Sequence, residues 1–223
     1  MSNNVVVAID VYSSCGKSTL AKALAKSLHF VYVDSGAMYR AVALYFLRNK
    51  IDLYDAEQVT SALKKIHLNF HARDYETHIT LNEEEVSGEI RQMPVSETVS
   101  AVSAIHDVRK EMVKQQQRMG RSKNIVMDGR DIGTAVFPDA TVKFFMTADP
   151  ITRAERRYKE LSPKNPDITL EEVFENIARR DYQDTTRKES PLVRAEDAIV
   201  LDNTDLTPDE QLLFALSKVE PYL

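Results

Sequence analysis

The sequence predicts an α/β protein with a five-stranded parallel sheet and helices on both faces. Short apolar, β-branched runs alternate with amphipathic segments along most of the 223 residues, and strands separated by helices pair in parallel. Polar residues directly follow several of these runs, at the strand ends where ligands bind in such sheets. Residues 66–104 have a different pattern of apolar and polar residues, which predicts a small inserted α+β domain.

The start of the chain carries the strongest short motif. Val5 to Ile9 is an apolar run that predicts a buried strand, Asp10 to Cys15 is a polar turn, and Gly16 to Thr19 opens an amphipathic helix. A strand, a tight loop, Gly-Lys-Ser and a helix are typical of a phosphate-binding loop, because N–H groups and the dipole at a helix N-terminus favour anions. In this interpretation Lys17 reaches the terminal phosphates and the Ser18 hydroxyl binds Mg²⁺.

Position 11 departs from this motif. The full pattern, Gly-x-x-x-x-Gly-Lys-[Ser/Thr], requires a glycine there, and the chain has Val11. A β-branched residue tolerates a positive φ badly, so a strained or reshaped loop is expected if this position needs a glycine conformation. Cys15 lies beside Lys17 at the helix start, which could lower its thiol pKa, although a loop residue without redox function is the simpler interpretation.

The other core elements follow in alternation. A strand at residues 30–34 precedes a turn at Ser35-Gly36, a helix at 37–48 and a helix that starts at Asp55. Further on, the patterns predict strands at 125–128, 141–147 and 198–202, and helices at 105–119, 150–161, 169–184 and from 207.

Residues 67–92 change the pattern. Apolar and polar residues alternate over 67–70 and 77–81, and an acidic turn follows at 82–85, which predicts a small antiparallel meander. Pro94 can lie near the start of the next helix. We therefore expect a core formed by 1–65 and 105–223, with 66–104 as an inserted subdomain.

Composition excludes several classes of protein. The net charge is −5, so the general electrostatic footprint of a nucleic-acid-binding protein is absent. A single cysteine excludes an internal disulfide. The chain has no 18-residue apolar run, and its N-terminus lacks a signal-peptide pattern, so we expect a cytoplasmic protein without membrane contact. Nothing in the sequence requires a dimer, and a monomer is expected.

Candidate site residues gather at predicted strand ends. These residues are Lys17, Asp34, Ser35, Asp128, Arg130 and Asp131. Asp128 ends an apolar strand, where it could position a Mg²⁺-bound water or merely cap the next turn.

Basic residues on two later helices are further candidates. The i, i+3, i+4 spacing of Arg153, Arg156 and Arg157 places them on one helix face, as a solvated salt-bridged surface or as a basic flap over phosphates. Arg180, Asp184 and Arg187 form a second stripe, which could be a simple intrahelical ion pair.

Longer motifs are more specific. They are IDVYSSCGKSTLAKALA at 9–25, VDSGAMYRAVAL at 33–44, VSGEIR at 86–91, DGRDIGTAVFPDA at 128–140, RRYKEL at 156–161, RRDYQDTTR at 179–187 and PLVRAEDAIVLDNT at 191–204. On these motifs, which span nearly the whole chain in order, the sequence resembles the bacterial cytidylate kinase family of P-loop nucleoside monophosphate kinases. The segment 66–104 also resembles this family's enlarged monophosphate-binding domain. Val11 departs from the family's glycine.

The resemblance implies an enzyme that transfers the γ-phosphoryl group of Mg-ATP to CMP or dCMP. The implied ATP site comprises Ser13, Ser14, Cys15, Gly16, Lys17, Ser18, Thr19 and Arg156, with Ser18 as the Mg²⁺ ligand. The implied CMP site comprises Ser35, Arg40, Ser100, Arg109, Arg130, Asp131, Arg180, Asp184 and Arg187. In such enzymes the base would be read by Ser35, Ser100, Arg109, Asp131 and Asp184, and the phosphate would be met by Arg40, Arg130 and Arg187.

Catalysis and closure are implied in the same way. The groups expected to act in transfer are Lys17, Asp128, Arg130, Arg153 and Arg157, and residues of about 150–168 would form a lid over ATP. Two other functions stay open at this point. One is a nucleotide-binding protein of the same fold with impaired or no transfer because of Val11, and the other is a kinase for UMP or AMP.

Overall fold

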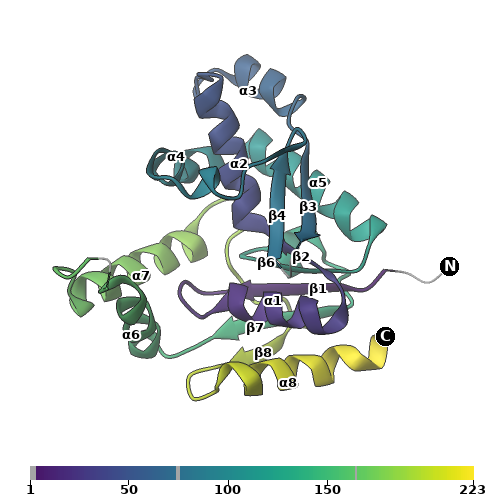
Figure 1. Ribbon diagram of the computed structural model, residues 1–223, viewed down its shortest axis with the longest axis vertical. Helices are drawn as coiled ribbons and strands as arrows, with labels where there is room; N and C mark the ends of the chain where they lie inside the picture. The colour runs from purple at the N-terminus through teal and green to yellow at the C-terminus, as the bar shows by residue number, and fades with distance from the viewer. Residues whose placement is uncertain (1–3, 74–75, 164) are drawn as a thin grey trace.

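The protein, described here from a computed structural model over residues 4–73, 76–163 and 165–223, has a parallel sheet at its centre (Figure 1). Its strands are β1 (Val6–Val11), β2 (Val31–Asp34), β6 (Ile125–Gly129), β7 (Val142–Thr147) and β8 (Ile199–Asp202). They pair in the order β2-β6-β1-β7-β8, all in parallel. The predicted five-stranded parallel sheet is confirmed.

Helices cover both faces of this sheet, and others lie beyond its edges and strand ends. They are α1 (Lys17–Leu28), α2 (Ser35–Arg48), α3 (Ala56–Leu63), α4 (Met93–Ser103), α5 (His106–Ser122), α6 (Pro150–Leu161), α7 (Leu170–Thr186) and α8 (Pro208–Val219). Alternate residues of β1 face opposite sides, as the pleat requires. Val7 and Ile9 pack with α1 and α8, whereas Val6 and Ala8 pack with α2 and α5.

A second, antiparallel sheet lies beside α2. It consists of β3 (Leu68–Arg73), β4 (Glu76–Leu81) and β5 (Glu84–Glu85), and a short 3₁₀ turn, η1 (Glu89–Arg91), follows it. The predicted meander is confirmed. Arg48 at the end of α2 joins the two parts, because its guanidinium donates to Glu84 at 2.7 and 2.8 Å and to Glu89 at 3.1 and 2.6 Å.

One local prediction was wrong, and one element was not predicted. Ser35-Gly36 is the first turn of α2 rather than a separate turn, because the Asp34 carboxylate caps the helix by accepting the Ala37 N–H at 2.9 Å. The residues after β6 form a single π-helical turn, η2 (Ile132–Val136), which the sequence pattern did not indicate.

The helical pair α6 and α7 lies beyond the carboxyl ends of the strands, on the side of the sheet where β1 leads into α1 (Figure 1). The two helices pack through Ala154, Val173 and Ile177. None of the helices in the described part of the chain is long and apolar enough to cross a bilayer.

Candidate active site

The phosphate-loop motif connects β1 to α1, as predicted. Its left-handed residues are Ser14, with φ of 62°, and Gly16, with φ of 79°, which forms the N-cap of α1. Val11 is the last residue of β1, is fully buried and packs in the layer beneath α1 and α8. Position 11 needs no glycine conformation, because Val11 is not among the positive-φ residues of the described chain. The strain considered for Val11 is therefore not found.

Lys17 faces a buried carboxylate at the end of β6. Its Nζ lies 3.6 Å from Oδ2 of Asp128, whose side chain has no exposed surface. The Tyr32 hydroxyl donates to Asp128 Oδ1 at 2.7 Å, whereas Oδ2 has no hydrogen-bond partner among the described residues. Burial raises the pKa of Asp128 to about 6, against the opposing effect of Lys17.

Asp128 Oδ2, which faces Lys17 but accepts no hydrogen bond from the described residues, bears on the expected Mg²⁺. Mg²⁺ prefers hard oxygen ligands and commonly takes one or two protein oxygens beside substrate phosphates. Oδ2 of Asp128 is such an oxygen, and the Ser18 hydroxyl lies close by, within hydrogen-bonding reach of Tyr32. These residues fit a Mg²⁺ ion.

A cleft of about 460 Å³ opens beside Lys17 and Ser18 at the strand ends. Its lining includes every residue of the implied CMP site: Ser35, Arg40, Ser100, Arg109, Arg130, Asp131, Arg180, Asp184 and Arg187. These residues come from α2, α4, α5, α7 with its C-cap Arg187, and the segment after β6. The structure therefore brings together nine residues that the sequence separates by up to 152 positions, from 35 to 187.

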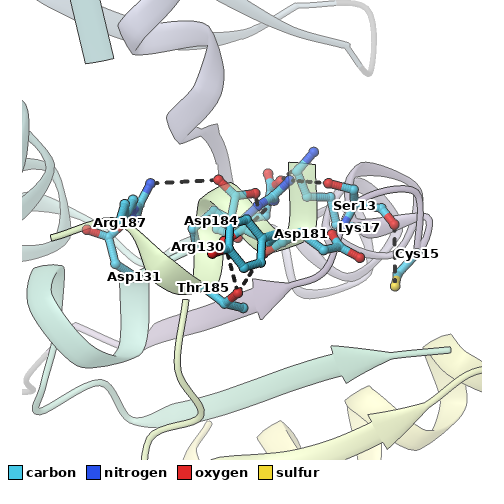
Figure 2. Close-up of polar contacts among 12 residues, drawn as sticks. Ser13, Cys15, Lys17, Arg130, Asp131, Asp181, Asp184, Thr185 and Arg187 are labelled. Carbon is cyan, nitrogen blue, oxygen red and sulfur yellow. Dashed lines mark hydrogen bonds and ion pairs between the residues drawn. The ribbon is translucent and has the colours of Figure 1, made fainter. Parts of the chain in front are cut away.

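Alternating charges organise the cleft, as Figure 2 shows for part of it. Asp131 accepts from Arg109 at 2.6 Å and lies 3.5 Å from Arg187. Asp184 accepts from Arg130 Nε at 2.6 Å. Arg40 pairs with Asp34 at 3.1 Å. The arrangement offers guanidinium groups for a phosphate and carboxylates for ring or amino N–H donors.

The three arginines of α6 do not form one solvated face. Arg153 is buried and donates to Ala148 O, Ser13 O and Asp181. Arg156 donates to Asn203 Oδ1 at 3.0 Å and to the carbonyls of Asn203 and Thr204.

Arg157 is partly exposed, unlike the buried Arg153. It pairs with Glu160 at 2.6 Å and lines a cavity of about 620 Å³ with Ser14 and Arg180. The stripe on α7 is also more than an intrahelical pair, because Asp184 and Arg187 reach Arg130 and Asp131 on another element.

Four site-supporting residues escaped the sequence interpretation. Asp10 accepts the N–H groups of Ile132 and Gly133 at 2.7 and 2.8 Å and so holds the segment that carries Arg130 and Asp131. The other three are Tyr32, Asp181 and Asn203, which bond to Asp128, Ser13 and Cys15 respectively.

A weak signal existed for two of the four. Asp10 and Asn203 follow predicted strands, as the identified site residues do, but nothing in the sequence names their partners. A lowered pKa of the Cys15 thiol, considered from its place beside Lys17, is not found, because burial raises this pKa to about 11.

Comparison with known proteins gives a consistent result. The family model described as cytidylate kinase matches residues 7–220. The chain is 53% identical over 210 residues to a cytidylate kinase of Cytophaga hutchinsonii, covering 93% of this chain and 90% of the relative. It is 51% identical over 213 residues to that of Bacteroides fragilis, with 93% of each covered, and 50% identical over 220 residues to that of Flavobacterium johnsoniae, with 96% of each covered.

Solved structures support the fold at lower identity. An uncharacterised protein from Eubacterium ventriosum aligns with a TM-score of 0.54 at 10% identity, covering 98% of this chain and 99% of that one. The protein TT1252 from Thermus thermophilus aligns with a TM-score of 0.50 at 18% identity, covering 99% and 98%.

Proposed function

The chain belongs to the cytidylate kinase family, and from this we propose that it transfers the γ-phosphoryl group of ATP to CMP or dCMP, giving ADP and CDP or dCDP. It is an ATP-dependent nucleoside monophosphate kinase, a phosphotransferase. We choose CMP or dCMP as the phosphate acceptor because of the cleft beside Lys17, whose lining contains all nine residues implied for the CMP site.

The proposed reaction needs no protein nucleophile. An oxygen of the CMP phosphate attacks the γ-phosphorus of ATP in line, the bond from that phosphorus to the β–γ bridging oxygen breaks, and ADP leaves with the electron pair. Lys17 lies at the junction of the loop and the cleft, where its ammonium group can stabilise charge on the transferring group. Arg130 would hold the acceptor phosphate from the other side.

Mg²⁺ would be held at Ser18 and near Asp128, and when bound it would neutralise charge on the β- and γ-phosphates. Arg153, Arg156 and Arg157 are proposed to serve the ATP side. For Arg153 and Arg156 this role requires release from their present protein partners or an indirect action through them.

The domain division belongs to the same proposal. Residues 1–65 and 105–223 would form the core, 66–104 the acceptor-binding subdomain and about 150–168 the lid, with residues 74–75 and 164 outside the described structure. Movement of the last two parts would exclude water during transfer. We further propose a monomer that acts on free nucleotides rather than nucleic acid, given the net charge of −5, and that works in the cytoplasm, where ATP and CMP are available.

ADP release from Mg-ATP by the purified protein tests the proposal. CMP, dCMP, UMP, AMP and no acceptor would be compared, with a Lys17→Ala variant as the protein control. We expect release with CMP and dCMP only, and almost none from the variant. Equal release with AMP would identify a different acceptor, and tight CMP binding without any release would indicate a binding protein of this fold.

A further inference from the structure

Ser13 of the phosphate loop is enclosed by side chains from three other elements. Its N–H donates to Asp181 Oδ1 of α7 at 2.9 Å, and its carbonyl accepts from Arg153 Nη1 of α6 at 3.0 Å. Its hydroxyl lies 3.4 Å from Arg130 Nη2. Ser13 is 1% exposed, so these groups replace water around it. Figure 2 shows Ser13 beside Asp181 and Arg130.

Asp181 connects two of these partners. Its Oδ2 accepts from the same Arg153 Nη1 that bonds to Ser13, and the side chains of Asp181 and Arg153 are 14% and 7% exposed. Arg153 is also fixed by the Ala148 carbonyl at 3.1 Å and lies over the Tyr12 ring at 5.5 Å. Charged hydrogen bonds shielded in this way are stronger and more directional than surface pairs.

The same helix carries acceptor-site residues. Asp184 lies one turn beyond Asp181 on α7 and accepts from Arg130, which in turn reaches the Ser13 hydroxyl. The contacts close a ring that runs from Ser13 to Asp181, along α7 to Asp184, through Arg130 and back to Ser13. One part of the ring faces the ATP loop and the other faces the CMP cleft.

We propose that Asp181 is a positioning residue that couples the two nucleotide sites through this ring. This inference rests on the proposed function. CMP would engage Asp184 and Arg130, and any shift of α7 or Arg130 would reach Ser13 through Asp181. Because coupling between two ligands is reciprocal, each nucleotide then changes the affinity for the other by the same factor.

Calorimetric binding tests this without turnover. The Kd of CMP would be measured with and without a non-hydrolysable ATP analogue and Mg²⁺, for the wild type, Asp181→Asn and Asp181→Ala. In the wild type we expect the two Kd values to differ about fivefold or more, the usual range of such coupling. Asp181→Asn keeps an acceptor for Ser13 but presents an amide to Arg153, whereas Asp181→Ala loses both contacts.

Both variants should bind CMP alone with a Kd within about twofold of the wild type, because Asp181 does not line the cleft. For each variant, the ratio of the CMP Kd without the ATP analogue to the CMP Kd with it should approach one. Turnover should show a kcat/KM for ATP reduced about tenfold, consistent with loss of charged hydrogen bonds. Glu171→Gln removes the same charge from an exposed position at the start of α7 and should leave all these values unchanged.

The inference and the proposed function can fail separately. Equal CMP affinity with and without the analogue in the wild type, or an unchanged ratio in folded Asp181→Asn, would overturn the inference whatever the turnover. Absence of CMP-dependent ADP release would overturn the function alone. If both Asp181 variants fail to fold, Arg153→Lys replaces them in the test. A single ammonium group cannot bond to Ser13, Asp181 and Ala148 together. An unchanged ratio of the CMP Kd values in that variant would also overturn the inference.

Discussion

The side chain of Val11 packs in the apolar layer between β1, α1 and α8, together with Val7, Ile9 and Cys15. The phosphate loop itself obtains its left-handed conformations from Ser14 and Gly16. A glycine at position 11 would remove a fully buried side chain and add backbone freedom to the unfolded chain, and both effects reduce stability.

Val11→Gly is therefore expected to lower the free energy of unfolding by about 2–4 kcal/mol without raising kcat. Urea unfolding together with the ADP-release assay measures both quantities. Val11→Ala separates the two causes, because it removes most of the side chain but keeps an ordinary backbone. A tenfold rise in kcat for the glycine variant would show instead that Val11 obstructs the nucleotide.

Asp10 illustrates how one buried carboxylate can shape a site from behind. It accepts two N–H groups at the start of η2, yet burial outweighs these bonds and raises its pKa to about 6. Between about pH 4 and 6 the Asp10 carboxyl is therefore protonated in the folded protein, whereas in the unfolded chain it has lost its proton. Stability from Asp10 is complete below pH 4 and is lost as the pH rises through 6.

Asp10→Asn should remove this pH dependence. At pH 4 the variant should be less stable than the wild type, because its amide cannot accept both N–H groups. The difference in free energy of unfolding, variant minus wild type, should then increase by up to about 3 kcal/mol between pH 4 and 7. Urea unfolding at a series of pH values checks this. Asp128 titrates in the same range in both proteins and cancels from the difference; a constant difference at every pH would refute the assignment.

At the scale of elements, the start of α2 depends on Asp34. Its carboxylate caps the helix through Ala37 and pairs with Arg40, so one side chain positions the helical turns that carry Ser35 and Arg40 into the cleft. The α3 helix has an equivalent cap away from the cleft, where Asp55 accepts from the N–H groups of Glu57 and Gln58, each at 3.0 Å.

Asp34→Ala should lower stability by about 1–2 kcal/mol, the usual cost of losing such a cap, and Asp55→Ala should also lower it. Only Asp34→Ala should also change the Kd of CMP, because Asp34 lines the cleft and orders Ser35 and Arg40 there, whereas Asp55 does neither. Chemical unfolding and calorimetric CMP titration of both variants test this comparison. Altered CMP affinity in the Asp55 variant would mean that helix stability in general, rather than Asp34 itself, controls the site.

Elements with a strong local pattern could be predicted from the sequence. The β-branched runs of β1 and β6 and the Thr169–Glu172 capping box of α7 specify structure within a few residues of themselves. The start of α2 and the π turn η2 could not be predicted in this way. The Asp34 cap is local, but a turn at Ser35-Gly36 competes with it as an interpretation of the same residues. The turn η2 instead depends on Asp10, which lies on another strand and has no local signal.

Across the whole molecule, the candidate site could be predicted as a set of residues but not as a network. Parallel strand ends place Lys17, Asp128 and Asp131 together, which topology alone requires. The pairing of Arg153 with Asp181 or of Arg156 with Asn203 depends on how α6 and α7 pack beside the loop. Such partners have no signal in sequence spacing, so the α6 arginines could not be distinguished from a solvated face.

The whole fold should respond to acceptor binding, because the cleft draws on α2, α4, α5 and α7 at once. A ligand present at 100 times its Kd stabilises the folded state by about 2.7 kcal/mol. For a chain of 223 residues, this corresponds to a rise in Tm of about 5–10 °C. CMP should produce this shift without ATP.

Thermal unfolding with CMP, UMP, AMP and cytidine, each at the same concentration, tests recognition independently of turnover. Cytidine should shift the Tm less than CMP, because it presents no anion to Arg40, Arg130 and Arg187. UMP and AMP should also raise the Tm less than CMP does. The edges of their bases differ from cytosine in hydrogen-bond donors and acceptors, and would leave buried groups such as Arg109 and Asp131 incompletely paired. Equal shifts for all three monophosphates would mean that the cleft recognises only phosphate and that its carboxylates serve to hold the arginines in place.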